Sequence, residues 1–150
     1  MQARMTNPVM VLPDAMRALL ELGRVAQSGT VPETTHRLIH LRVSQINGCG
    51  MCVDMHSREL KESGEKDERI WGVGAWRESP YFSDAERTAL ELAECVTRIA
   101  DRSEAVPDEV WGRAAEHYDE EELSSLLLSI AAINVWNRIN VATRQPAGSS

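Results

Sequence analysis

Cys49, Cys52 and His56 form a C-x-x-C-x-x-x-H pattern that directly follows the dipeptide Asn47-Gly48. Side chains of these types at this spacing can serve three purposes. The cysteines could be a redox-active thiol pair with histidine as proton acceptor, they could bind a metal ion, or they could be two buried cysteines beside an unrelated histidine. The elements that position the three side chains decide which purpose the pattern favours.

Hydrophobic periodicity places the pattern at the start of a helix. A preceding helix is expected over residues 32–46, and Gly48 can take the left-handed conformation that closes it. With the next helix beginning near Cys49, the three side chains share one narrow stripe at roughly 100° per residue. The free N–H groups and the dipole of a helix N-terminus stabilise a thiolate, and His56 lies one turn beyond Cys52. The residues therefore favour an attacking thiolate, a resolving thiol and a base.

The two structural alternatives use the same side chains differently. A closed zinc site needs four ligands, and the pattern supplies three, with His36, His40 or His117 as a possible fourth. Three ligands on one helix face suit a tetrahedral site poorly, since structural zinc sites usually draw on two separate elements. Plain core packing of the cysteine pair is the other alternative. The third cysteine, Cys95, stands among residues of helical spacing and is expected to be a buried small hydrophobe.

Length and composition limit the class of protein that carries the pattern. The chain has 150 residues, with 43% apolar and 26% charged residues, which is typical of one soluble globular domain. A formal charge of −7 with scattered arginines argues against a nucleic acid or a membrane as partner. Neither a signal peptide nor a membrane span is apparent, so a cytoplasmic location is expected. An odd number of cysteines in a reducing cytosol is a poor basis for a disulfide framework.

The rest of the chain also has helical period. No alternating strand pattern or internal repeat appears, and the missing β-α-β units exclude a thioredoxin fold. The sequence predicts an all-α fold with one domain over 1–150, including an N-terminal arm at 1–12 and a disordered tail at 145–150. Besides the two helices around the cysteines, helices are expected over 13–29, 66–75, 84–100 after the capping box at Ser83–Glu86, 106–118, and from Asp119 onward.

Three stretches, LRVSQINGCGMCVDMHSREL, GVGAWRESPYF and IAAINVWNRIN, resemble the carboxymuconolactone decarboxylase superfamily, and more narrowly its alkylhydroperoxidase D-like branch. The resemblance is dense from Leu41 to His56 and looser through to Arg138. It implies a compact multi-helix fold that assembles as a homo-oligomer, a trimer or a hexamer. It also implies a thiol-dependent peroxidase without a cofactor, which reduces (alkyl) hydroperoxides at the expense of a dithiol or lipoyl-type reductant.

By position, the resemblance implies a role for each member of the pattern. Cys52 would be the attacking thiol, Cys49 the resolving thiol that forms a disulfide with it, and His56 a member of the proton relay. A non-enzymatic redox-sensing or assembly protein is the alternative function, and a zinc-stabilised structural domain is the third.

Two positions depart from the family pattern. Arg37 stands twelve residues before the first cysteine, where the family commonly has a glutamate that serves the relay. Arginine can stabilise a thiolate by its charge, but it cannot accept a proton. Met51 replaces a histidine of the founding member. Glu33 and His40 lie one turn either side of Arg37 and could substitute in the relay, although both are expected on a solvated helix surface.

Overall fold

The computed structural model describes residues 1–148, and every regular element in that range is a helix. The absence of strands within these residues confirms the predicted all-α class. The α-helices are α1 (Pro8–Val11), α2 (Pro13–Ala26), α3 (Glu33–Asn47), α4 (Gly50–Glu62), α5 (Asp67–Gly72), α6 (Asp84–Thr97), α7 (Asp108–His117) and α8 (Glu120–Thr143), with 3-10 turns at Val73–Glu78 and Ile99–Asp101.

The predicted capping box at the start of α6 is present. The Ser83 hydroxyl accepts a hydrogen bond from the Glu86 N–H, and the Glu86 carboxylate accepts one from the Ser83 N–H. Asp119 and Glu122 form the same arrangement at the start of α8. Each box satisfies donors that a helix N-terminus leaves unpaired, so these two starts follow from local sequence.

Three helices end earlier than the sequence predicts, and the one expected over 13–29 ends at Ala26. The helix expected over 66–75 ends at Gly72 and continues as a 3-10 turn, within which Ala75 has a non-helical φ of −124°. The helix expected to reach residue 100 ends at Thr97, before a second 3-10 turn. Gly72 and Gly74 explain why the helix expected over 66–75 ends early, because glycine lowers the stability of a helix interior by about 1 kcal/mol.

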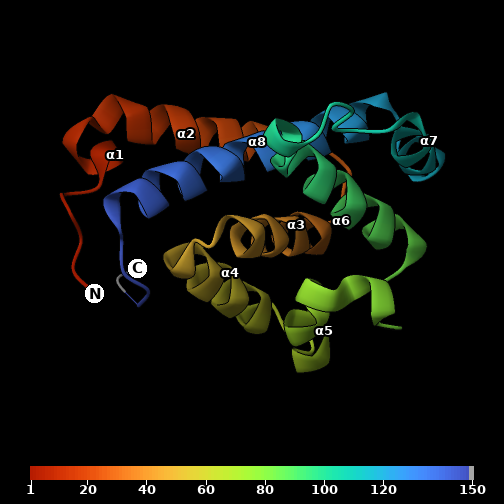
Figure 1. Cartoon of the computed structure of the whole chain (residues 1–150), viewed down its shortest axis with the longest axis horizontal. Coiled ribbons are helices and arrows are strands. Elements are labelled where there is room, and N and C mark those ends of the chain that lie inside the picture. Colours follow the sequence, from red (N-terminus) through yellow and green to blue (C-terminus); the bar gives the residue numbers. More distant parts are fainter. Residues whose placement is uncertain (149–150) are drawn as a thin grey trace.

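Helix α3 lies at the centre of the molecule and packs against α4, α6 and α8 (Figure 1). It is buried on more than one side, and Leu38 and Leu41 belong to a different core cluster from Ile39 and Val43. Helix α2 runs along α8 and α1 packs on α2, so these three elements lie together (Figure 1). The cysteine helix, α4, is therefore held by α3 and also contacts α8.

The two ends of the described chain lie together at the end of α8 (Figure 1). The Arg4 N–H donates to the Thr143 carbonyl at 2.9 Å, and the Gln145 amide donates to the Met5 carbonyl at 3.1 Å. The N-terminal arm thus contains the short helix α1 and is hydrogen-bonded to the last residue of α8 and to Gln145 just beyond it. Residues 149–150 of the expected tail lie outside the described residues, and its disorder stays a prediction.

Candidate active site

A left-handed glycine makes the turn that delivers the cysteine pair. The backbone of Gly48 has a φ of +66°, which residues other than glycine adopt only at a cost in energy. Gly48 closes α3, as predicted. The Cys49 N–H then donates back to the Ser44 carbonyl at 3.0 Å. Cys49 is the N-cap of α4, and its sulfur accepts a hydrogen bond from the Cys52 N–H at 3.4 Å. The helix N-terminus therefore faces the cysteine sulfurs, as the sequence predicts.

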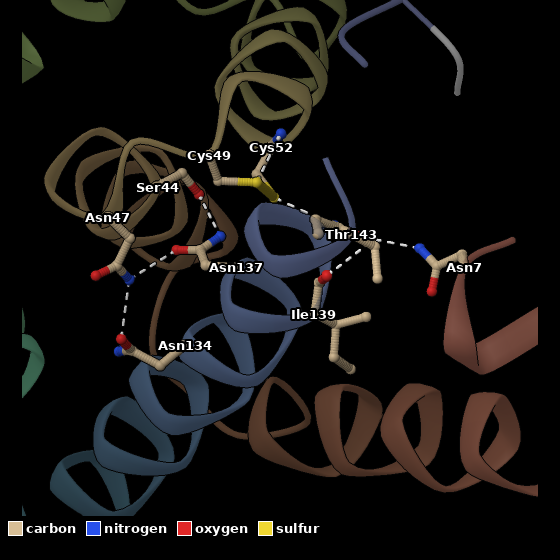
Figure 2. The surroundings of a disulfide bond; sticks show 10 residues. Asn7, Ser44, Asn47, Cys49, Cys52, Asn134, Asn137, Ile139 and Thr143 are labelled. Carbon is tan, nitrogen blue, oxygen red and sulfur yellow. Dashed lines mark hydrogen bonds between the residues drawn. A yellow bond between two sulfur atoms is a disulfide. The ribbon is translucent and has the colours of Figure 1, made fainter. Parts of the chain in front are cut away.

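Buried asparagines of α8 hold this turn in place. The Asn47 amide donates to Asn134 Oδ1 and to Asn137 Oδ1, at 3.0 Å each. The Asn137 amide in turn donates to Ser44 Oγ at 3.1 Å. Figure 2 shows these side chains of α3 and α8 facing one another beside the cysteines. Because buried polar groups are costly to leave unpaired, the network fixes α8 against the residues just before Cys49.

Cys49 and Cys52 are joined as a disulfide, with their Cα atoms 5.3 Å apart (Figure 2). Both side chains are buried, with 2% and 1% of their surface exposed. The Asn140 amide donates to the Cys52 sulfur at 3.4 Å, and the Asn7 amide donates to Asn140 Oδ1 at 2.8 Å. A donor held in this way would also hydrogen-bond a thiolate on Cys52 once the disulfide is reduced.

A cavity of about 1070 Å³ opens beside the cysteine helix. Its lining among the described residues includes Cys52 and His56 but not Cys49. The N-terminus of α4 favours an anion on either sulfur. The cavity distinguishes the two cysteines, because Cys52 belongs to its described lining and Cys49 does not. Much of the remaining lining is apolar and comes from α1, α2, α4 and α8, including Met10, Met16, Leu19, Met51, Met55, Ile133 and Trp136.

His56 is paired with an acid that the sequence reasoning missed. Its Nδ1 lies 2.8 Å from Glu59 Oε2 on the next turn of α4. The hydrogen bond from His56 lowers the pKa of Glu59 and keeps the carboxylate charged, so Nδ1 carries the hydrogen of the neutral ring and Nε2 carries a lone pair. His56 Nε2 is buried without a hydrogen-bond partner among the described residues. The pairing could have been predicted from the sequence, because residues three positions apart on a helix are neighbours on its surface.

Arg37 occupies the family's glutamate position and supports that new acid. One guanidinium nitrogen donates to the Glu59 carbonyl oxygen at 2.7 Å, and another donates to Glu33 Oε1 at 2.5 Å. The Arg37 side chain is 24% exposed, whereas Glu33 is 71% exposed and lies on the surface as expected. The positive charge of Arg37 also helps to lower the pKa of Glu59. The site thus has its carboxylate on α4 in place of one on α3.

His40 does not lie on a solvated helix surface, and that expectation is wrong. The side chain is partly buried, lines the cavity and has its ring centroid 5.1 Å from that of His56. The cause is the packing of α8 on this face of α3, where Ser129 Oγ lies 2.8 Å from His40 Nε2. Two imidazoles, and not one, therefore share the cavity with Cys52.

The remaining candidate residues lie elsewhere or do not form a metal site. Within residues 1–148, no three His, Cys, Asp or Glu side chains are arranged so that they could hold a metal ion. His117 is exposed on α7, away from the cysteine helix. Cys95 is buried, as predicted, and burial raises the pKa of its thiol. No helix in the described part of the chain is long and apolar enough to cross a membrane.

Comparison with known proteins identifies the family. The model of the carboxymuconolactone decarboxylase family matches residues 13–94, more than half of the chain. The chain belongs to this family. An uncharacterized protein of Bacillus subtilis, YdfG, is 41% identical over 139 residues, which is 93% of either chain. The similarity between this chain and YdfG therefore extends well beyond the cysteine pattern.

Two further relatives are of the AhpD type. A crystal structure from Agrobacterium tumefaciens, of a protein of unknown function suggested to be the antioxidant defence protein AhpD, has a TM-score of 0.91 at 36% identity and covers 99% of this chain and 100% of its own. The alkyl hydroperoxide reductase AhpD of Methylocella silvestris is 43% identical over 65 residues, or 43% of this chain and 34% of that protein. The chain is thus an AhpD-like member of the family, and its full-length relatives named here are themselves uncharacterized.

Proposed function

We propose that the protein is a thiol-dependent peroxidase that reduces alkyl hydroperoxides, with Cys52 as attacking thiol and Cys49 as resolving thiol. One observation carries the proposal: Cys52 lines a cavity together with His56, whose buried Nε2 is unpaired among the described residues and whose Nδ1 is bonded to the Glu59 carboxylate. Once the disulfide is reduced, these residues would supply a nucleophile and a base that is itself oriented by a third group.

The proposed reaction begins with the reduced cysteine pair. The Cys52 thiol gives its proton to His56 Nε2, and the thiolate attacks the terminal oxygen of the hydroperoxide. A sulfur–oxygen bond forms while the oxygen–oxygen bond breaks, and the leaving alkoxide takes the proton from His56, which yields an alcohol and a sulfenic acid on Cys52. The charged Glu59 stabilises the imidazolium between these two transfers.

The second half of the cycle returns the thiols. Cys49 attacks the sulfenic sulfur, the new disulfide forms as the sulfur–oxygen bond breaks, and the thiol proton of Cys49 leaves with the hydroxide as water. An external dithiol then reduces the disulfide and is itself oxidised to a disulfide. A slender dithiol of the lipoyl type suits a buried pair that is reached through a cavity, and the cytoplasm is where such reductants are maintained.

The substrate class follows from the cavity lining. Methionine and leucine side chains, such as Met16, Leu19 and Met55, surround the approach to Cys52. Burying an apolar substituent there is favourable by roughly 25 cal/mol per Å². A hydroperoxide with a bulky apolar group should therefore react faster than hydrogen peroxide, which agrees with the name of the AhpD relative.

The test is steady-state reduction of cumene hydroperoxide with dihydrolipoamide as electron donor. We expect turnover that exceeds the reaction of dihydrolipoamide alone, and a higher kcat/KM for cumene hydroperoxide than for hydrogen peroxide. After one oxidation, thiol counting should show that Cys49 and Cys52 are lost and Cys95 is retained. A disulfide that forms and is reduced without peroxide turnover would instead identify a redox-sensing protein and reject the enzyme.

We further propose that the protein is a homo-oligomer, a trimer or a hexamer. Apolar side chains are exposed on the neighbouring helices α2 and α8, among them Leu20, Val25, Leu128 and Val135. Such side chains are favoured at subunit contacts, and closed symmetry is the general rule for assemblies of one chain. Light scattering at micromolar concentration should give three or six times the 16.7 kDa chain mass. A monomeric mass would contradict this expectation.

A further inference from the structure

A chain of hydrogen bonds runs from His40 into the protein interior. His40 Nε2 lies 2.8 Å from Ser129 Oγ, and the same oxygen lies 3.0 Å from His36 Nδ1. His36 Nε2 lies 3.4 Å from Ser125 Oγ, which donates to the Ala26 carbonyl at 2.5 Å. The chain joins α3, α8 and the last residue of α2. Neither cysteine nor Glu59 takes part in it.

The far end of the chain fixes the direction of every hydrogen bond. The Ala26 carbonyl can only accept, so the single hydroxyl hydrogen of Ser125 goes to it, and Ser125 must accept from a hydrogen on His36 Nε2. A neutral His36 then accepts at Nδ1 from the Ser129 hydroxyl. Ser129 has no second hydrogen to give, so it accepts from a hydrogen on His40 Nε2. The remaining nitrogen of His40, Nδ1, is therefore left with a lone pair.

Both imidazoles of the chain are neutral. Burial lowers the pKa of His40 well below its usual range, and the nearby His56, His36 and Arg37 lower it further. Burial also lowers the pKa of His36, against a smaller opposing effect of Glu33. A neutral imidazole with its Nε2 hydrogen already bonded can only accept at Nδ1. His40 and Cys52 line the same cavity, and Nδ1 of His40 is a fixed acceptor.

We propose that His40 Nδ1 binds the substrate by accepting a hydrogen bond from the terminal O–H of the hydroperoxide. The inference rests on the proposed peroxidase function and assigns a residue that recognises the reacting group itself. The terminal oxygen is the one that Cys52 attacks, so its hydrogen bond orients the oxygen–oxygen bond before the reaction. His40 gains and loses no proton, because this oxygen keeps its hydrogen and becomes the sulfenic acid hydroxyl. In this proposal His56 accepts the thiol proton, and His40 positions the peroxide.

Two substitutions at position 40 separate the two nitrogens. The amide of His40→Gln can reach Ser129 as Nε2 does, but it offers no acceptor at the place of Nδ1. The shorter His40→Asn places an amide oxygen near the Nδ1 position instead. Both are made in a Cys49→Ser background, where one peroxide gives one sulfenic acid. The rate of that oxidation is compared with the rate at which methyl iodoacetate alkylates Cys52, a reaction that requires the thiolate and a reagent that has no hydrogen-bond donor for His40 to bind.

We expect His40→Gln to lower the peroxide rate about tenfold, the effect of one lost hydrogen bond, with the alkylation rate unchanged. His40→Asn should recover most of the peroxide rate. Ser129→Ala, which frees the His40 ring to exchange its hydrogen between nitrogens, should lower the peroxide rate alone. His117→Gln, at an exposed histidine of α7, is the matched control and should change neither rate.

The outcomes distinguish this inference from the function on which it rests. An equal fall in the peroxide and alkylation rates of His40→Gln would mean that His40 acts on the thiolate or on the fold, and it would overturn the proposal. An unchanged peroxide rate would overturn it as well. If the protein with His40 intact reacts with peroxide no faster than a free thiol, the peroxidase function itself fails, and this role for His40 fails with it.

Discussion

Replacing Cys52 by serine is expected to abolish peroxide turnover, with a loss of about a thousandfold or more. The reason is access: Cys52 lines the cavity, whereas Cys49 is absent from the described lining. Serine keeps the size of the side chain but offers no thiolate near neutral pH, so the first bond to oxygen cannot form. Steady-state reduction of cumene hydroperoxide with dihydrolipoamide measures the effect.

Cys49→Ser should behave differently, although it also stops turnover. One equivalent of peroxide should still be consumed, because Cys52 can attack but the sulfenic acid then has no partner thiol. Cys95→Ser is the matched control, and since Cys95 is buried apart from the cavity lining it should retain full turnover. Substantial turnover by Cys52→Ser would contradict the assignment of the attacking thiol.

Glu59→Gln is expected to lower the rate of peroxide reduction about a hundredfold, within the range typical of general acid–base groups. The glutamine oxygen can still accept a hydrogen bond from His56 Nδ1, so the ring keeps its orientation. The negative charge is lost, however, and the imidazolium that carries the Cys52 proton is no longer stabilised. Single-turnover oxidation followed over a range of pH measures the effect.

A matched control for this substitution lies on the same helix. Glu62 is exposed near the end of α4, and Glu62→Gln removes the same charge without touching His56. It should leave the rate within about twofold. If Glu59→Gln and Glu62→Gln have equal and small effects, the pairing of His56 with Glu59 has no part in the reaction and another group must hold the proton.

The parts of the site that the sequence predicted depend on neighbours along the chain. The left-handed turn at Gly48, the helix start at Cys49 and the capping box at Ser83 are set by residues a few positions apart, and the structure contains all of them. The stripe shared by Cys49, Cys52 and His56 follows from the same local geometry. Helical spacing is therefore enough to assemble the thiol pair and its histidine.

The parts that the sequence did not predict depend on distant elements. The sequence around His40 suggests a surface residue. In the structure, α8 covers this side chain and places Ser129, 89 positions later in the chain, within hydrogen-bond distance of it. Nothing local indicates which faces of the central helix α3 will be covered. Glu59 is different, because it stands three residues after His56 on the same helix and its pairing with His56 is a local contact. The family's glutamate position is on α3, where this chain has Arg37. Because Glu59 lies on α4, a comparison with the family pattern position by position does not find it.

The identity of the first sulfur to be oxidised tests the account most directly. The reduced protein is treated with less than one equivalent of cumene hydroperoxide in the presence of dimedone, which traps sulfenic acids, and the adduct is located by mass spectrometry. In the Cys49→Ser variant we expect the adduct on Cys52, formed much faster than on a free thiol such as glutathione. The claim that Cys52 is the attacking thiol would be contradicted if Cys49 in the Cys52→Ser variant formed the adduct at this rate and Cys52 in the Cys49→Ser variant formed none.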